Sequence, residues 1–72
     1  MDIKVFKKSL KSIVDGNPEK GIKGIVIDNE CFTLDRIVSL ELKANSVILE
    51  TADQGVLAFC GSPDMLIDII KE

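Results

Sequence analysis

The stretch VILETADQGVLAFC, residues 47–60, decides the fold of this chain. It holds two apolar runs, 47–49 and 56–60, on either side of the polar segment 53–55, whose composition resembles a three-residue hairpin loop with glycine in the left-handed conformation. Both runs are apolar at consecutive positions, whereas a strand with one face in water alternates apolar and polar residues. The stretch therefore predicts an antiparallel hairpin whose strands are covered on both faces.

The same pattern of short apolar runs and turn residues continues toward the N-terminus. Asn29 tolerates the left-handed conformation that a tight turn needs. Residues 22–61 thus predict a five-stranded antiparallel meander, either open or curled toward a small barrel. The strands are expected at residues 22–28, 31–34, 37–43, 47–51 and 56–60.

One helix is expected before these strands in the sequence and one after them. Residues 2–14 carry one apolar stripe at three- and four-residue steps, and the polar segment 15–21 reads as a linker. At the other end, Ser62 and Pro63 are residues that favour a helix start, so we predict a second helix over residues 63–71. The apolar stripe of the first helix consists of Ile3, Phe6, Leu10, Ile13 and Val14. The expected fold is a single α+β domain spanning residues 1–72.

The composition argues against an enzyme. The 72 residues include no histidine, the side chain most often used for acid–base chemistry near neutral pH. Cys31 and Cys60 are far apart in the sequence and form no CxxC pair, which gives no indication of a metal or redox centre. Both lie beside a phenylalanine in apolar strands, so we expect buried, reduced thiols. We predict no catalytic residue, no metal site and no cofactor.

The sequence also favours a cytoplasmic location. Its N-terminus interleaves lysines with apolar residues and resembles no signal peptide. No apolar run approaches the roughly 18–20 residues of a membrane span.

Charge is distributed unevenly around a net value of −3. Residues 1–23 carry six lysines and three acidic residues, or +3, and residues 24–72 carry three basic and nine acidic residues, or −6. Four of the lysines form one face of the first helix: Lys4, Lys7, Lys8 and Lys11. This face is either a ligand-binding surface for anions or the solvated side of a packed helix. Nearby arginines or stacking aromatics, which would favour nucleic acid, are absent from it.

Arg36 is the only arginine in the chain, and hence the only guanidinium available to bind a phosphate or carboxylate in a bidentate manner. It follows Asp35 in a turn, so a local ion pair explains it as well. Arg36 and the four helix lysines are the candidate ligand-binding residues.

Residues 22–70 resemble the FlbD-type flagellar family of small bacterial proteins. The residues that carry the resemblance are Phe32-Thr33-Leu34-Asp35, Val47-Ile48-Leu49-Glu50-Thr51, Gly55 and Ser62-Pro63-Asp64-Met65-Leu66-Ile67. The resemblance implies a strand meander followed by a helix, and it carries over no catalytic residue. This chain departs from the family in its first turn, Asp28-Asn29-Glu30, and in its extra N-terminal helix.

These observations favour a homo-oligomer, because two short helices cannot cover both faces of so apolar a sheet. We expect a non-enzymatic interaction or adaptor protein of a bacterium or phage, a dimer or higher oligomer that could also take a protein partner or an anionic small molecule. One alternative is an oligomer that sequesters a nucleotide-like signal through the helix lysines and Arg36. A second alternative is weak nucleic-acid binding through the lysine face.

Overall fold

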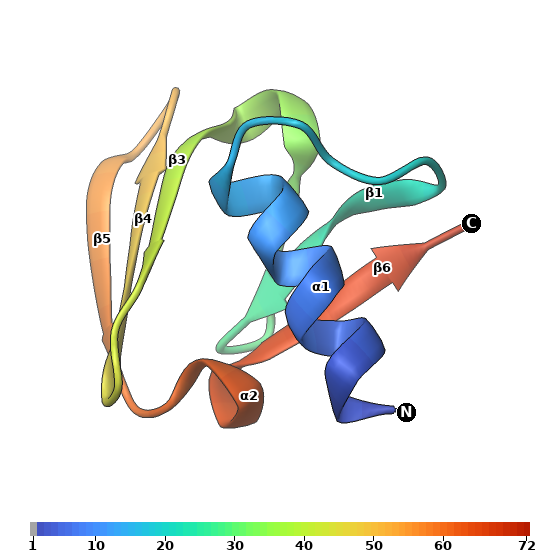
Figure 1. Ribbon diagram of the computed structural model, residues 1–72. Coiled ribbons are helices and arrows are strands. Elements are labelled where there is room, and N and C mark those ends of the chain that lie inside the picture. The colour runs from blue at the N-terminus through green and yellow to red at the C-terminus, as the bar shows by residue number, and fades with distance from the viewer. Residues whose placement is uncertain (1) are drawn as a thin grey trace.

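The computed structural model describes residues 2–72 as a helix, two three-stranded antiparallel sheets and two short helical turns (Figure 1). In chain order the elements are α1 (Ile3–Val14), β1 (Ile22–Ile27), β2 (Glu30–Thr33), η1 (Leu34–Arg36), β3 (Ile37–Leu42), β4 (Ser46–Thr51), β5 (Gly55–Cys60), α2 (Pro63–Leu66) and β6 (Ile67–Lys71). The first sheet has the strand order β2-β1-β6 and the second β3-β4-β5. The predicted mixed α+β class is confirmed.

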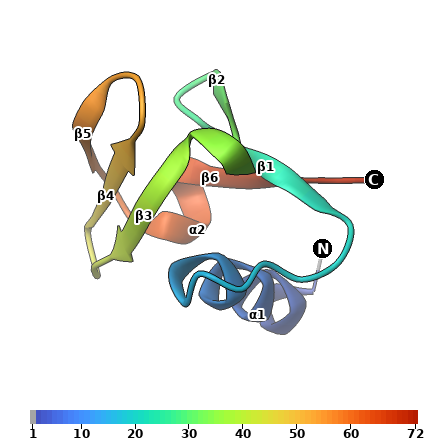
Figure 2. The same ribbon diagram turned by 90° about the horizontal axis from the view of Figure 1, so that it is seen from above.

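Helix α1 forms where the spacing of its apolar side chains predicts it. The Asp2 carboxylate accepts a hydrogen bond from the backbone N–H of Lys4 at 2.9 Å, which caps the first turn. The buried face of the helix consists of Phe6, Ser9, Leu10 and Ile13. This face contacts β3 of one sheet and β6 of the other, so α1 bridges the two sheets (Figure 2). Neither helix of the described chain is long and apolar enough to cross a membrane.

A two-residue turn joins β1 to β2. Asp28 and Asn29 both have positive φ, 54° and 65°, as a type I′ turn requires, so the left-handed conformation predicted for Asn29 is confirmed. The turn sets the register in which Ile27 lies opposite Glu30 and Ile25 opposite Phe32. This register places Ile25, Ile27 and Phe32 in the core, where all three side chains are fully buried.

The predicted C-terminal helix over residues 63–71 is wrong beyond its first turn. Residues 63–66 are helical, as the start signals at Ser62 and Pro63 indicate, but 67–71 form strand β6, antiparallel to β1. Two physical reasons favour the strand. The β-branched side chains of this segment suit a sheet, and β1 would otherwise leave one row of backbone groups unpaired.

The prediction that five consecutive strands form one continuous meander is wrong. The 3₁₀ turn η1 interrupts the chain between β2 and β3, so the strands divide into two sheets that do not close into a barrel. Among residues 2–72, the meander is limited to β3, β4 and β5. Within it, Gly55 adopts a φ of 75° after the turn, which confirms the left-handed glycine of the predicted hairpin.

The hydrophobic core lies between the two sheets and α1. Val47 and Leu49 of β4 are fully buried and face the core of the first sheet, while Ile67 of β6 is 2% exposed. The intervening Ile48 and Val26 are half-buried on the outer faces. The apolar residues of these strands therefore do lie on both faces, but only one face of each sheet joins the main core.

Candidate functional site

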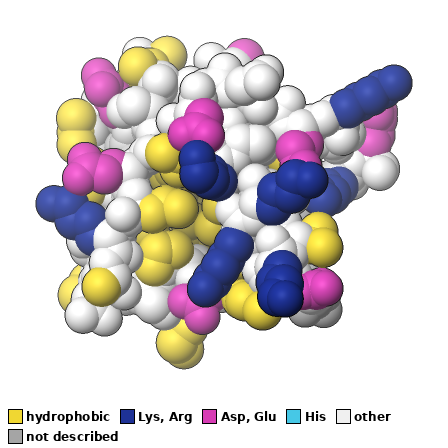
Figure 3. Space-filling view, viewed as in Figure 1, with side chains coloured by type: hydrophobic (Ala, Val, Ile, Leu, Met, Phe, Trp, Pro, Cys, Tyr) yellow, Lys and Arg dark blue, Asp and Glu magenta, His cyan; other side chains and the backbone are white. Residues whose placement is uncertain are grey.

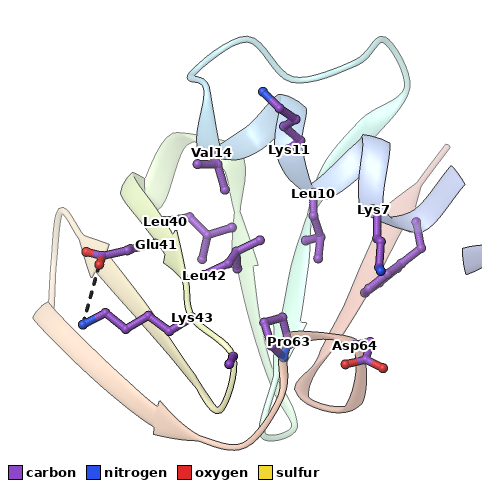
Figure 4. Close-up of a pocket in the computed structure, with 12 residues that line it drawn as sticks. Lys7, Leu10, Lys11, Val14, Leu40, Glu41, Leu42, Lys43, Pro63 and Asp64 are labelled. Atoms are coloured by element: carbon purple, nitrogen blue, oxygen red, sulfur yellow. Dashed lines mark ion pairs between the residues drawn. The ribbon is translucent and has the colours of Figure 1, made fainter. Parts of the chain in front are cut away.

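A groove of about 540 Å³ lies between α1 and β3, and we call it the α1–β3 groove (Figure 4). The residues that line it come from α1, from β3 with the turn that follows it, and from α2: Phe6, Lys7, Leu10, Lys11, Val14, Leu40, Glu41, Leu42, Lys43, Ala44, Pro63 and Asp64. Figure 4 shows Leu10, Leu40, Leu42 and Pro63 converging on its floor, while Glu41 and Lys43 point away. On this side of the molecule, hydrophobic side chains are visible between lysines (Figure 3). The groove therefore joins an apolar floor to a basic rim.

One wall of the groove is the free edge of β3, which has no strand partner on that side in the described chain. The N–H of Lys43 donates to the carbonyl of Ser46 at 2.9 Å, which makes this pair a hydrogen-bonded one. Such pairs alternate along an antiparallel ladder, so Ser39 and Glu41 also direct their backbone groups toward β4. The N–H and C=O groups of Leu40 and Leu42 consequently point away from β4, on the side of the groove.

The four lysines of α1 take different positions. Lys7 and Lys11 line the groove, whereas Lys4 and Lys8 do not. Lys11 forms an ion pair with Asp15 at 2.9 Å, and Lys8 approaches Glu19 at 4.0 Å. Among residues 2–72, Lys4 and Lys7 have no ion-pair partner. The lysine face is therefore partly neutralised at its C-terminal end and free near the start of the groove.

Arg36 is engaged within the protein. Its Nε and Nη2 donate to the two carboxylate oxygens of Asp53 at 3.2 and 3.0 Å, and its Nη1 donates to the carbonyl of Cys31 at 2.9 Å. The guanidinium also lies 5.1 Å from the centre of the Phe32 ring and 3.5 Å from Glu30. Its ion-pair partners are thus Asp53 and Glu30, in place of the neighbouring Asp35.

The hydrogen bonds between Arg36 and Asp53 shift the pKa values of both side chains. The bond from Arg36 holds the pKa of the Asp53 carboxyl below its usual value, and the same bond raises the pKa of Arg36. The pair fastens η1 to the β4–β5 turn. No lysine of α1 is among the partners of Arg36, so the structure does not unite the five candidate ligand-binding residues in one site.

The second feature is the outer edge of β5, which we call the β5 edge. The N–H of Gly61 donates to the carbonyl of Asn45 at 2.9 Å, so Phe59 and Leu57 also pair with β4 through hydrogen bonds. The backbone groups of the alternate residues therefore point outward. These residues, Val56, Ala58 and Cys60, also have exposed side chains.

Both cysteines are exposed free thiols, which corrects the prediction that they are buried. Cys31 lies on β2 and Cys60 on β5, each at the edge of its sheet, where the apolar neighbours in sequence point to the opposite face. Neighbouring residues of a strand point to opposite faces, so a cysteine next to the inward-facing Phe32 or Phe59 points outward.

The sequence identified the lysines of the groove rim but missed its β3 wall. The alternation of Val38, Leu40 and Leu42 was a signal that one face of this strand is apolar. It could not show that α1, about 30 positions earlier in the sequence, leaves an opening beside them.

Residues 2–72 contain no group of three or more His, Cys, Asp or Glu side chains that could hold a metal ion.

No known protein family, curated protein sequence or solved structure matches this chain.

Proposed function

We propose that the protein is a non-enzymatic homo-oligomeric interaction protein whose copies associate through the β5 edge. The observation that carries the proposal is the composition of this strand, GVLAFC, which contains no charged residue. Each of the other three edge strands has at least one: Glu30 on β2, Glu41 on β3, and Asp68 and Lys71 on β6. Charges on an edge strand oppose pairing with another chain, so β5 is the edge that lacks this protection.

The exposed side chains of β5 support the same conclusion. Val56 is 66% exposed, and Ala58 lies beside the half-buried Ile48 on the outer face of the sheet. Two copies of β5 that pair antiparallel about Ala58 would join their sheets into one of six strands and place these apolar side chains side by side. The arrangement uses the same patch on both copies, as twofold symmetry requires.

Light scattering across a micromolar concentration series tests the proposal. We expect a mass near twice the 7.9 kDa of one chain. Ala58→Lys places a charge at the centre of the β5 edge and should give a monomer that keeps its fold, because Ala58 is exposed and its N–H does not pair with β4.

Val38→Lys is the matched control, since Val38 is 59% exposed on another strand of the same sheet. It should leave the mass at the dimer value. A parent protein that stays monomeric at all concentrations, or an Ala58→Lys variant that still dimerises, would refute association through β5.

A further inference from the structure

We propose that the α1–β3 groove binds an extended, acidic and apolar peptide segment of a partner protein, which adds to the free edge of β3 as a further strand. This surface lies on the opposite side of the second sheet from the β5 edge, because β4 separates the two strands. The proposal therefore goes beyond self-association and does not depend on it. A chain that has both surfaces could hold a copy of itself and a partner together.

The backbone of β3 provides the first part of the argument. The N–H and C=O groups of Leu40 and Leu42 point away from β4, and α1 on that side is a helix that satisfies its own backbone groups. An extended segment in the groove can form the ladder bonds that β3 lacks. Peptide recognition by strand addition uses such an edge for its affinity.

The floor of the groove provides the second part. Leu10 of α1, Leu42 of β3 and Pro63 of α2 border the same apolar space. An added strand directs alternate side chains to this side of the sheet. Apolar residues in this row would fill the floor and exclude water from it, and an acidic residue at one end of the same row would face α1.

The charges at the rim provide the third part. Helix α1 contains four lysines and no acidic residue between Ile3 and Val14, and Lys7 is without an ion pair among residues 2–72. On the β3 wall, the Glu41 side chain points away from the groove and forms an exposed ion pair with Lys43 at 3.7 Å, so its charge does not face the floor. Asp64 contributes one carboxylate at the α2 end. Acidic ligand residues facing α1 therefore complement the groove, which selects against a basic segment.

Three fluorescein-labelled peptides test the proposal by anisotropy. The first, Glu-Ser-Val-Ser-Val-Ser, places one glutamate and two valines on the same face of an extended strand and should bind. The second, Lys-Ser-Val-Ser-Val-Ser, should bind at least about tenfold more weakly because its charge opposes the lysines of α1. The third replaces the first valine of the first peptide by proline, which removes a backbone donor and should weaken binding by a similar factor. Equal binding of all three would refute strand addition.

Amide hydrogen exchange locates the peptide. Binding of the first peptide should slow exchange at Leu40 and Leu42 and leave Ala58 unchanged, because only the β3 edge becomes paired. Protection at Ala58 in place of Leu40 and Leu42 would assign the peptide to the β5 edge and overturn the proposal. Absence of binding at millimolar peptide would overturn it as well.

Paired charge reversals complete the test. Lys7→Glu should weaken binding of the acidic peptide by about tenfold, whereas Lys20→Glu, an exposed lysine in the loop outside the groove, should change it by less than about twofold. Equal effects of the two variants would show that the peptide responds only to the net charge of the N-terminal region, which would contradict binding in the α1–β3 groove. The Ala58→Lys monomer should bind the peptide like the parent, so failure of dimerisation and failure of peptide binding are separate results.

Discussion

Arg36 illustrates how a residue with the chemistry of a ligand-binding site can instead stabilise the fold. Its guanidinium binds Asp53 across 17 positions of sequence, donates to the carbonyl of Cys31 and lies over the Phe32 ring. These contacts join the turn η1 to β2 of the first sheet and to the β4–β5 turn of the second. A separation of this length is invisible to local sequence analysis, which had only the adjacent Asp35 to offer as a partner.

The Arg36–Asp53 pair predicts a pH-dependent stability. The pKa of the Asp53 carboxyl is lowered in the folded protein, so the stabilisation is fully present above its ordinary value of about 4 and is lost as the pH falls through the lower folded-state pKa. Asp53→Asn should lower the melting temperature at pH 7, and the difference from the parent should shrink below about pH 4.

Asp35→Asn is the control, because Asp35 forms no ion pair with Arg36. A difference between parent and Asp53→Asn that persists unchanged at pH 2 would show that the carboxylate charge is not its source.

Gly24 is a residue of β1 at which the paired strand leaves no room for a side chain. A Cβ atom added there would overlap the backbone carbonyl oxygen of Phe32 on the paired strand. Gly24→Ala should therefore reduce the free energy of unfolding by about 1–3 kcal/mol in urea denaturation. Lys23→Ala, at the exposed neighbouring position, should change it by less than about 0.5 kcal/mol. Equal stability of the two variants would mean that β1 and β2 separate easily.

At the scale of elements, β6 is the segment that completes the first sheet. Ile67 is 2% exposed and lies opposite Ile27, whereas Met65 in the preceding turn is 86% exposed. Ile67→Ala should cost about 2–5 kcal/mol of unfolding free energy through the cavity that it leaves. Met65→Ala should be nearly neutral. If both variants unfold at the same urea concentration as the parent, the C-terminal segment is not part of the core.

The elements that the sequence predicts correctly are those determined by neighbouring residues. Helix α1 follows from its apolar stripe and Asp2 cap, and the first five strands lie within one residue of the predicted bounds. Residues 67–71 were misassigned because the helix start at Pro63 is a local signal, while the free edge of β1 that recruits them is some 40 positions away in sequence. The turn around Asp35 and Arg36 was expected, but its consequence, the division of the strands into two sheets, was missed because it depends on pairing between distant strands.

At the scale of the whole molecule, the β5 edge and the α1–β3 groove are both built on free sheet edges. The sequence indicates the first of them but not the second. The apolar run 56–60 was visible in the sequence and motivated the expectation of a homo-oligomer. The α1–β3 groove needed the structure, because it depends on how a helix docks against a strand distant in sequence. The proposed adaptor combines them, with a copy of the chain at β5 and an acidic peptide at β3.

Disulfide trapping is the measurement that tests the central claim, self-association through β5, most directly. In the antiparallel pair centred on Ala58, Val56 of one copy lies opposite Cys60 of the other, at the Cα separation of about 5.5 Å expected for a hydrogen-bonded pair. This separation suits a disulfide. A protein with Val56→Cys, and with Cys31→Ser to remove the other thiol, should oxidise to a covalent dimer. Within one strand, positions 56 and 60 lie roughly 13 Å apart, too far to bond to each other.

We predict that peptide mapping of this dimer joins position 56 of one chain to Cys60 of the other, and that Cys31→Ser alone stays largely uncrosslinked. A doubly substituted protein that remains monomeric under the same oxidation, or that links only Cys60 to Cys60, would contradict the β5 interface.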